Sequence, residues 1–131
     1  MGTRTFKTID NLELIIKNTQ KNIIFETKPL NIRQWKFVFQ FNKETFTELL
    51  NYLKDVSSKT WHDFSPREAT SLSSDYAEYY DRAFDSAGFL IVNWSSNTLK
   101  VERPSLDSAE LYKFSKRRME SFVYDFKRVN L

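Results

Sequence analysis

The sequence contains a single histidine, His62, and an aspartate, Asp63, follows it directly. An imidazole beside a carboxylate is part of the Ser-His-Asp arrangement of hydrolases, and several serines lie nearby in the sequence. A general base must lie within hydrogen-bond reach of a positioned nucleophile, yet no Gly-x-Ser-x-Gly turn is present to hold one. We therefore interpret His62 as a loop residue beside an anchoring Trp61, and we predict that the protein is not an enzyme. A hydrolase centred on His62 remains an alternative.

Acidic and tyrosine side chains alternate in the second half of the chain. In a helix, Glu78, Asp81 and Asp85 are three and four positions apart and share one face. Tyrosines such as Tyr76 and Tyr79 are enriched at protein interfaces, so this helix is predicted to bind a basic groove of another protein. The alternative is a solvated helix face whose tyrosines pack on the core. The predicted protein-binding residues are Trp61, Tyr76, Glu78, Tyr79, Asp81 and Asp85.

Basic residues cluster near the C-terminus, in the run 116–118 and again at 127–128. One interpretation is contact with nucleic-acid phosphates, which would make binding steeply dependent on salt. The other is ordinary helix charge, favoured by the dipole at a helix C-terminus and diluted by acidic neighbours such as Glu120. The residues predicted for this alternative function are Lys113, Lys116, Arg117, Lys127 and Arg128.

The composition excludes several other functional classes. The 131 residues fit one domain, and 20 basic against 17 acidic residues give only a mild positive charge of +3. Without cysteine there are no disulfides and no thiolate chemistry, which is compatible with the cytoplasm. One histidine and two glycines exclude His-rich metal sites and phosphate-binding glycine loops. No apolar run approaches the roughly 20 residues that span a bilayer. We expect no cofactor, no metal and no membrane insertion.

One stretch organises the predicted fold, because every second residue in it is aromatic: Trp35, Phe37, Phe39 and Phe41. In a strand these four rings point to one side, and mostly polar residues point to the other. Covering such a face gains roughly 1.5–3 kcal/mol per buried side chain. We expect the rings to form core rather than a base-stacking platform, covered by a helix over about 43–55 that begins at the cap Asn42.

The remaining patterns predict further elements. Helices are expected over about 10–20, between Asp75 and Gly88, and over about 107–128, with strands over 22–27, 89–94 and 98–103. A strand over 12–17 is the alternative for the first helix. Strand 22–27 is expected to pair with strand 35–41, and residues 57–74 are expected to form a mobile loop.

These elements predict an α+β two-layer sandwich in the order αββα-αββα, with an antiparallel sheet of about four strands packed against three to four helices. The same order suggests a weak internal repeat of 9–56 and 75–129 in a single domain. Small chains without catalytic motifs but rich in aromatics suit a protein-binding module that occludes its partner. Inhibitors of the phage or mobile-element type, such as anti-CRISPR or immunity proteins, are members of that class, although no residue pattern here resembles a family. The sequence does not define the oligomeric state, and a homodimer is also compatible with it.

Overall fold

The computed structural model describes residues 2–31, 33–68, 89–103, 105–107 and 109–128. Within these residues the chain forms seven strands and two helices. Their order is β1 (Gly2–Lys7), β2 (Glu13–Asn18), β3 (Ile23–Lys28), β4 (Lys36–Gln40), α1 (Lys43–Thr60), β5 (Phe89–Asn93), β6 (Thr98–Glu102), β7 (Tyr112–Phe114) and α3 (Lys116–Arg128). Neither helix combines the length and the apolar character that crossing a bilayer demands.

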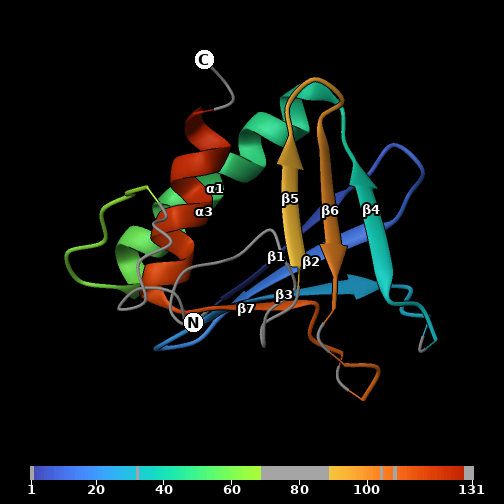
Figure 1. Cartoon of the computed structure of the whole chain (residues 1–131), viewed down its shortest axis with the longest axis horizontal. Helices are drawn as coiled ribbons and strands as arrows, with labels where there is room; N and C mark the ends of the chain where they lie inside the picture. Colours follow the sequence, from blue (N-terminus) through green and yellow to red (C-terminus); the bar gives the residue numbers. More distant parts are fainter. Residues whose placement is uncertain (1, 32, 69–88, 104, 108, 129–131) are drawn as a thin grey trace.

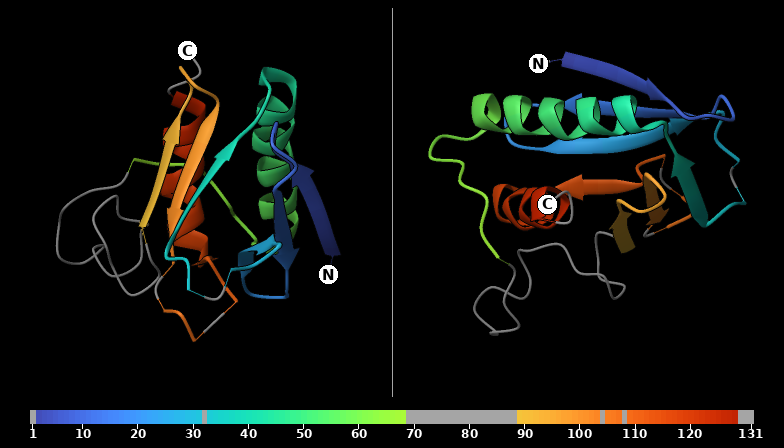
Figure 2. Two further views of the ribbon diagram at one scale, coloured as in Figure 1. Left: turned by 90° about the vertical axis from the view of Figure 1, so that its right-hand side faces the viewer. Right: turned by 90° about the horizontal axis from the view of Figure 1, so that it is seen from above.

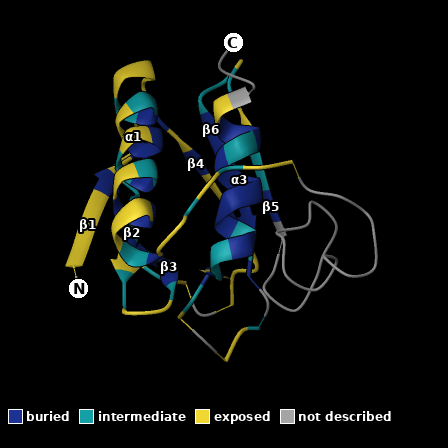
Figure 3. Cartoon of the chain, turned by 90° about the vertical axis from the view of Figure 1, so that its left-hand side faces the viewer, coloured by how far each residue is buried: buried dark blue, intermediate teal, exposed yellow. Residues whose placement is uncertain are grey.

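The strands form two antiparallel sheets (Figure 1). The larger sheet has the order β1-β2-β3-β7, and the smaller has the order β4-β6-β5. The helices α1 and α3 contact one another and lie on one side of the molecule. Seen from that side, α1 lies in front of the larger sheet and α3 in front of the smaller one (Figure 3), and the opposite view shows the strands in front of the helices (Figure 2). The inner faces of both sheets therefore share a single hydrophobic core with the two helices.

The predicted order αββα-αββα is wrong. The described residues form mostly strands in two sheets with few helices, not one sheet with three to four helices. The predicted helix between Asp75 and Gly88 lies outside the described residues. The expectations of one domain and of an internal repeat stay predictions.

The first predicted helix is the strand β2, as the alternative interpretation proposed. Leu14 and Ile16 are buried on alternate positions and pair with β1, so the period-two pattern prevailed over the local signs of a helix start. The hairpin turn is closed by the Thr8 hydroxyl, which contacts the Asp10 carboxylate and accepts a hydrogen bond from the Leu12 N–H at 2.9 Å. Asn11 takes a left-handed conformation in this turn, with φ of 68°.

The predicted pairing of strand 22–27 with strand 35–41 is also wrong. Strand β3 lies between β2 and β7, while β4 pairs with β6. The partner of β3 is in part the segment 112–114, which was expected to be helical. There Tyr112 and Phe114 are buried on alternate positions, so α3 begins only after Ser115, whose carbonyl accepts from the Met119 N–H at 3.0 Å.

Several local predictions are confirmed. The side chain of Asn42 accepts a hydrogen bond from the Thr45 N–H at 2.8 Å and caps α1. Hairpin β5–β6 is present, with Asn97 left-handed in its turn.

The helix α1 continues to Thr60, so the predicted loop does not begin at 57. The hydroxyl groups of Ser58 and Thr60 donate to carbonyls four residues earlier, so these side chains find their hydrogen-bond partners within the helix.

The aromatic strand is confirmed in part. Phe37, Phe39 and Phe41 are buried, whereas Trp35 precedes β4 and is 42% exposed. Trp35 shares the parity of the buried rings but lies beyond the end of the strand. The fourth ring of the predicted aromatic face is therefore available at the surface.

The alternation in β4 predicts a large effect on stability for one substitution and a small effect for its neighbour. Phe39→Ala should lower the free energy of unfolding by about 3–5 kcal/mol, because it leaves a cavity in the core. Val38→Thr, on the solvent side, should change it by less than about 1 kcal/mol. The free energy of unfolding of both variants is measured by urea unfolding, with the m-value checked to be the same for both. Similar losses of free energy for the two variants would contradict the inward placement of Phe39.

Candidate functional site

The strand β4 is an edge of the smaller sheet within the described residues. Its pairing with β6, continued beyond the strand ends, places Phe41 opposite Asn97 and Trp35 opposite Arg103. Both pairs are hydrogen-bonded. The Phe41 N–H donates to the Asn97 carbonyl at 2.9 Å, and the Arg103 N–H donates to the Trp35 carbonyl at 3.0 Å. In an antiparallel pair, hydrogen-bonded residues alternate with residues whose N–H and C=O point the other way. The backbone groups of the intervening Lys36, Val38 and Gln40 therefore point to the open edge.

Two of these outward groups have partners. Ile9, at the turn between β1 and β2, donates its N–H to the Gln40 carbonyl at 2.9 Å. The exposed side chain of Gln34 donates to the Lys36 carbonyl at 2.6 Å. The N–H and C=O of Val38 face outward between these two points. The open part of the edge is thus short and centred on Val38.

Exposed apolar side chains occur at three points along this edge. Among the described residues, four large apolar side chains are exposed, and three of them flank β4. Trp35, just before the strand, is 42% exposed, Val38 within it is 51% exposed, and Ile9, hydrogen-bonded to its last residue, is 61% exposed. Single exposed apolar residues are ordinary, but three of the four described ones lie in or next to one unpaired strand, which makes this edge the candidate site of interaction.

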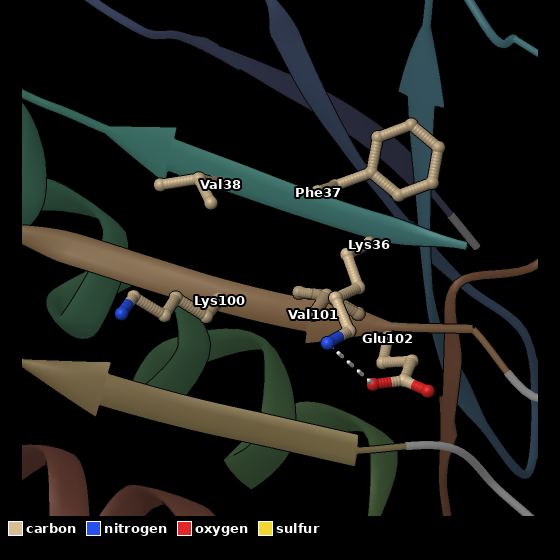
Figure 4. Close-up of a pocket in the computed structure, with 6 residues that line it drawn as sticks. All are labelled: Lys36, Phe37, Val38, Lys100, Val101 and Glu102. Carbon is tan, nitrogen blue, oxygen red and sulfur yellow. Dashed lines mark ion pairs between the residues drawn. The ribbon is translucent and has the colours of Figure 1, made fainter. Parts of the chain in front are cut away.

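A groove of about 490 Å³ runs over the outer face of β4 and β6 (Figure 4). Its lining is formed by Lys36, Phe37, Val38, Lys100, Val101 and Glu102. On the outer face Val38 lies opposite Lys100, and Lys36 lies opposite Glu102. The Lys36 ammonium is 4.0 Å from the Glu102 carboxylate, and Lys100 has no ion-pair partner within the part of the chain described. The groove is therefore apolar in the middle and carries one positive charge in excess.

We name this surface the β4 edge surface, formed by Ile9, Trp35, Lys36, Val38, Lys100 and Glu102. The sequence interpretation missed it, since it assigned Trp35 to the core and treated the outer side of β4 as polar. One signal was present: Val38 is the only apolar residue between the aromatic positions of that stretch. That signal is weak, because one apolar residue on a solvated face is common.

The edge of the larger sheet, β1, differs in character. Thr8 N–H donates to the Leu12 carbonyl at 2.8 Å, so by the same alternation Thr3, Thr5 and Lys7 direct their backbone groups outward. These exposed side chains are polar or charged, as is usual for a protected edge. Arg4 lies over the ring of Tyr52, with its guanidinium 5.1 Å from the ring centroid. Burial raises the pKa of the Tyr52 phenol, and the positive charge of Arg4 opposes that shift.

The residues predicted to bind a protein are not brought together in the described structure. Trp61 is only 9% exposed; its indole N–H donates to the Lys21 carbonyl at 2.9 Å, and its ring stacks on Phe64 with centroids 6.0 Å apart. Trp61 thus fastens the end of α1 to the turn between β2 and β3. The other residues of that prediction, Tyr76, Glu78, Tyr79, Asp81 and Asp85, lie outside the described residues.

The predicted nucleic-acid-binding residues occupy different surroundings. Arg117 is buried, and its guanidinium donates to the Ser121 hydroxyl at 2.7 Å and to the Glu68 carbonyl at 3.1 Å. Lys116 forms an ion pair of 3.1 Å with the buried Glu120. Lys113 is exposed on β7, on the sheet face that points away from the core.

Lys127 is exposed on α3, and Arg128 is the last residue of that helix. Within the described structure, the five predicted residues therefore do not form one basic surface.

The pair His62–Asp63 lies open to water. The His62 Nε2 is 3.4 Å from the Asp63 Oδ1, and the two side chains are almost fully exposed. Asp63 has a left-handed backbone, with φ of 60°, as expected for a turn after a helix. Within the residues described, no three His, Asp or Glu side chains gather in a way that could hold a metal ion.

Comparison of the chain with protein-family models found no match, and neither did comparison with curated proteins or with solved structures. Function must therefore be inferred from the surfaces of the molecule itself. Of these surfaces, the β4 edge surface combines open backbone groups, exposed apolar side chains and a groove.

The buried carboxylate Glu120 predicts a structural role for the basic start of α3. Glu120 is 2% exposed and accepts from the Ser65 N–H at 3.0 Å, in addition to its ion pairs with Lys116 and with Arg67 at 3.3 Å. Glu120→Gln should lower the free energy of unfolding by about 1.5–3 kcal/mol, because charge-assisted hydrogen bonds are lost. It should also speed tryptic cleavage after Arg67.

The matched control is Asp55→Asn, which removes an exposed ion pair of 3.2 Å with Lys59. Exposed pairs contribute little, so this loss should be about 0.5 kcal/mol or less, with cleavage after Arg67 unchanged. Equal effects of the two substitutions would show that Glu120 does not hold the segment 65–68 on α3.

Proposed function

We propose that the protein is a non-enzymatic binding module that attaches to another protein through the β4 edge surface. The observation that carries this proposal is that Ile9, Trp35 and Val38, three exposed apolar residues, lie at the two ends and in the middle of one unpaired strand edge. Exposed edge strands are a liability, and soluble proteins usually protect them with charged side chains, proline or a covering segment. An edge that instead presents apolar side chains is best explained by a partner that covers it.

The physical basis of binding is the removal of apolar area and of open backbone groups from water. Burying apolar surface contributes roughly 25 cal/mol per Å², and aromatic anchors such as Trp35 often dominate the energy of an interface. The charged groups of Lys36, Lys100 and Glu102 surround the apolar centre, an arrangement typical of protein interfaces with a polar rim.

We further propose that binding acts by occlusion, as in inhibitors of the phage or mobile-element type. This extension is supported by the absence of a catalytic arrangement among the described residues and by the small size of the chain. The nucleic-acid alternative has less support, because Arg117 is buried and Lys116 is paired with Glu120.

The proposal predicts position-specific photo-crosslinking. A photo-reactive phenylalanine analogue at position 38 should crosslink to one dominant protein in a lysate of the producing or host cell. The same analogue at Thr5, on the polar edge β1, should not, because that edge lacks apolar anchors. The adducts are identified by mass spectrometry, and nucleic acid is scored in the same samples.

Two variants test whether the crosslinked partner depends on the surface. Val38→Asp should reduce capture of that protein at least tenfold, while Thr5→Asp should leave it unchanged, with both variants first shown to unfold at the urea concentration of the parent. Equal crosslinking at both positions, or capture that survives Val38→Asp, would refute a binding function at β4. Crosslinks dominated by nucleic acid would favour the alternative.

A further inference from the structure

We propose that the occupant of the β4 edge surface is an extended, acidic segment of the partner protein that adds to β4 as a fourth strand of the smaller sheet. This inference rests on the proposed binding function and specifies the shape and the charge of what is bound. It follows from three features: the direction of the backbone groups, the limits of the open edge, and the charges beside it.

The backbone groups favour an extended segment over a helix. Lys36 and Val38 direct their N–H and C=O groups to the same edge and are about 6.8 Å apart, which is the two-residue repeat of a strand. A strand offers groups at the same repeat, whereas the backbone groups of a helix are already paired internally. The Lys36 carbonyl already accepts from the Gln34 amide at 2.6 Å, so the Val38 N–H and C=O and the Lys36 N–H are the groups that an added strand would pair with.

The limits of the edge define the register. At one end the Ile9 N–H already occupies the Gln40 carbonyl, so an added strand cannot continue past the turn between β1 and β2. At the other end β4 begins at Lys36, whose carbonyl is occupied by the Gln34 amide, and the bulky Trp35 precedes it. Pairing is therefore confined to about three or four residues centred on Val38, and the exposed Ile9 and Trp35 flank both ends.

The charges define the side chains of the segment. A residue opposite Val38 on the outer face meets an apolar side chain, and residues two positions away meet Lys36 or the end of the strand. Among the described residues that line the groove, Glu102 carries the one carboxylate that faces Lys36 and Lys100, and its distance to the Lys36 ammonium is 4.0 Å. An apolar residue flanked by Asp or Glu at alternate positions therefore matches the surface.

The first experiment selects peptides on the full-length protein. A display library of random ten-residue peptides is the probe, and the enriched sequences should carry a β-branched or aromatic residue with Asp or Glu two positions away. Enriched peptides should bind Val38→Asp at least tenfold more weakly. Lys100→Glu should weaken them about threefold or more, and the control Lys127→Glu, at an exposed position on α3, should have no effect.

The second experiment tests strand pairing directly. In an added strand, alternate N–H groups face β4, so N-methylation of one set of alternate residues in an enriched peptide should weaken binding about tenfold or more. N-methylation of the other set should have little effect. Hydrogen exchange of the Val38 amide in the full chain should slow when the peptide is bound.

The outcomes separate this inference from the proposed function. Peptides that lose binding with Val38→Asp but show no alternation on N-methylation, or that are basic, would overturn strand addition and leave a docking function at this surface. No enriched peptide, together with an intact crosslink at position 38, would also overturn it, since the partner would then use a folded surface. Failure of the crosslink at position 38 would remove the binding function itself.

Discussion

The two sheets depend on contacts between aromatic rings on both helices. Phe46 of α1 lies 4.5 Å from Trp94, in the turn of the smaller sheet, and 4.9 Å from Phe126 of α3, measured between ring centroids. One turn before Phe126 in α3, the ring of Phe122 lies 5.3 Å from the ring of Phe114 in the larger sheet, measured between centroids. Rings at these distances contribute both buried area and specific edge or offset contacts. The helices therefore join the sheets through one continuous aromatic core.

This shared core determines where the protein can meet other molecules. Most inward positions of the strands are used for packing, so within the described residues the outer sheet faces and the strand edges provide much of the surface. The edges formed by β1 and by β4 meet where the Ile9 N–H donates to the Gln40 carbonyl. From that corner β1 presents threonines and a lysine, and β4 presents Val38 with Trp35 nearby. The contrast between the edges is the physical basis for assigning binding to β4.

The helix α3 shows why charge in a sequence is a poor guide to binding. Its basic start contains Arg117, buried and bonded to Ser121, and Lys116, paired with a buried carboxylate. Buried charges must be paired because their desolvation is costly. Composition counts these side chains as cations available to phosphate, whereas burial and pairing assign them to holding the segment 65–68 against the helix.

The sequence by itself determined the local features: the buried side of β4 at Phe37, Phe39 and Phe41, the cap at Asn42, and the hairpin of β5 and β6. These follow from periodicity and turn chemistry, which act between residues close in the chain. Only the tertiary structure decided that segment 112–114 pairs with β3 and that Trp35 and Val38 border an open edge. Strand partners come from distant segments, so the identity of an edge, and the surface it offers, is not encoded in any local pattern.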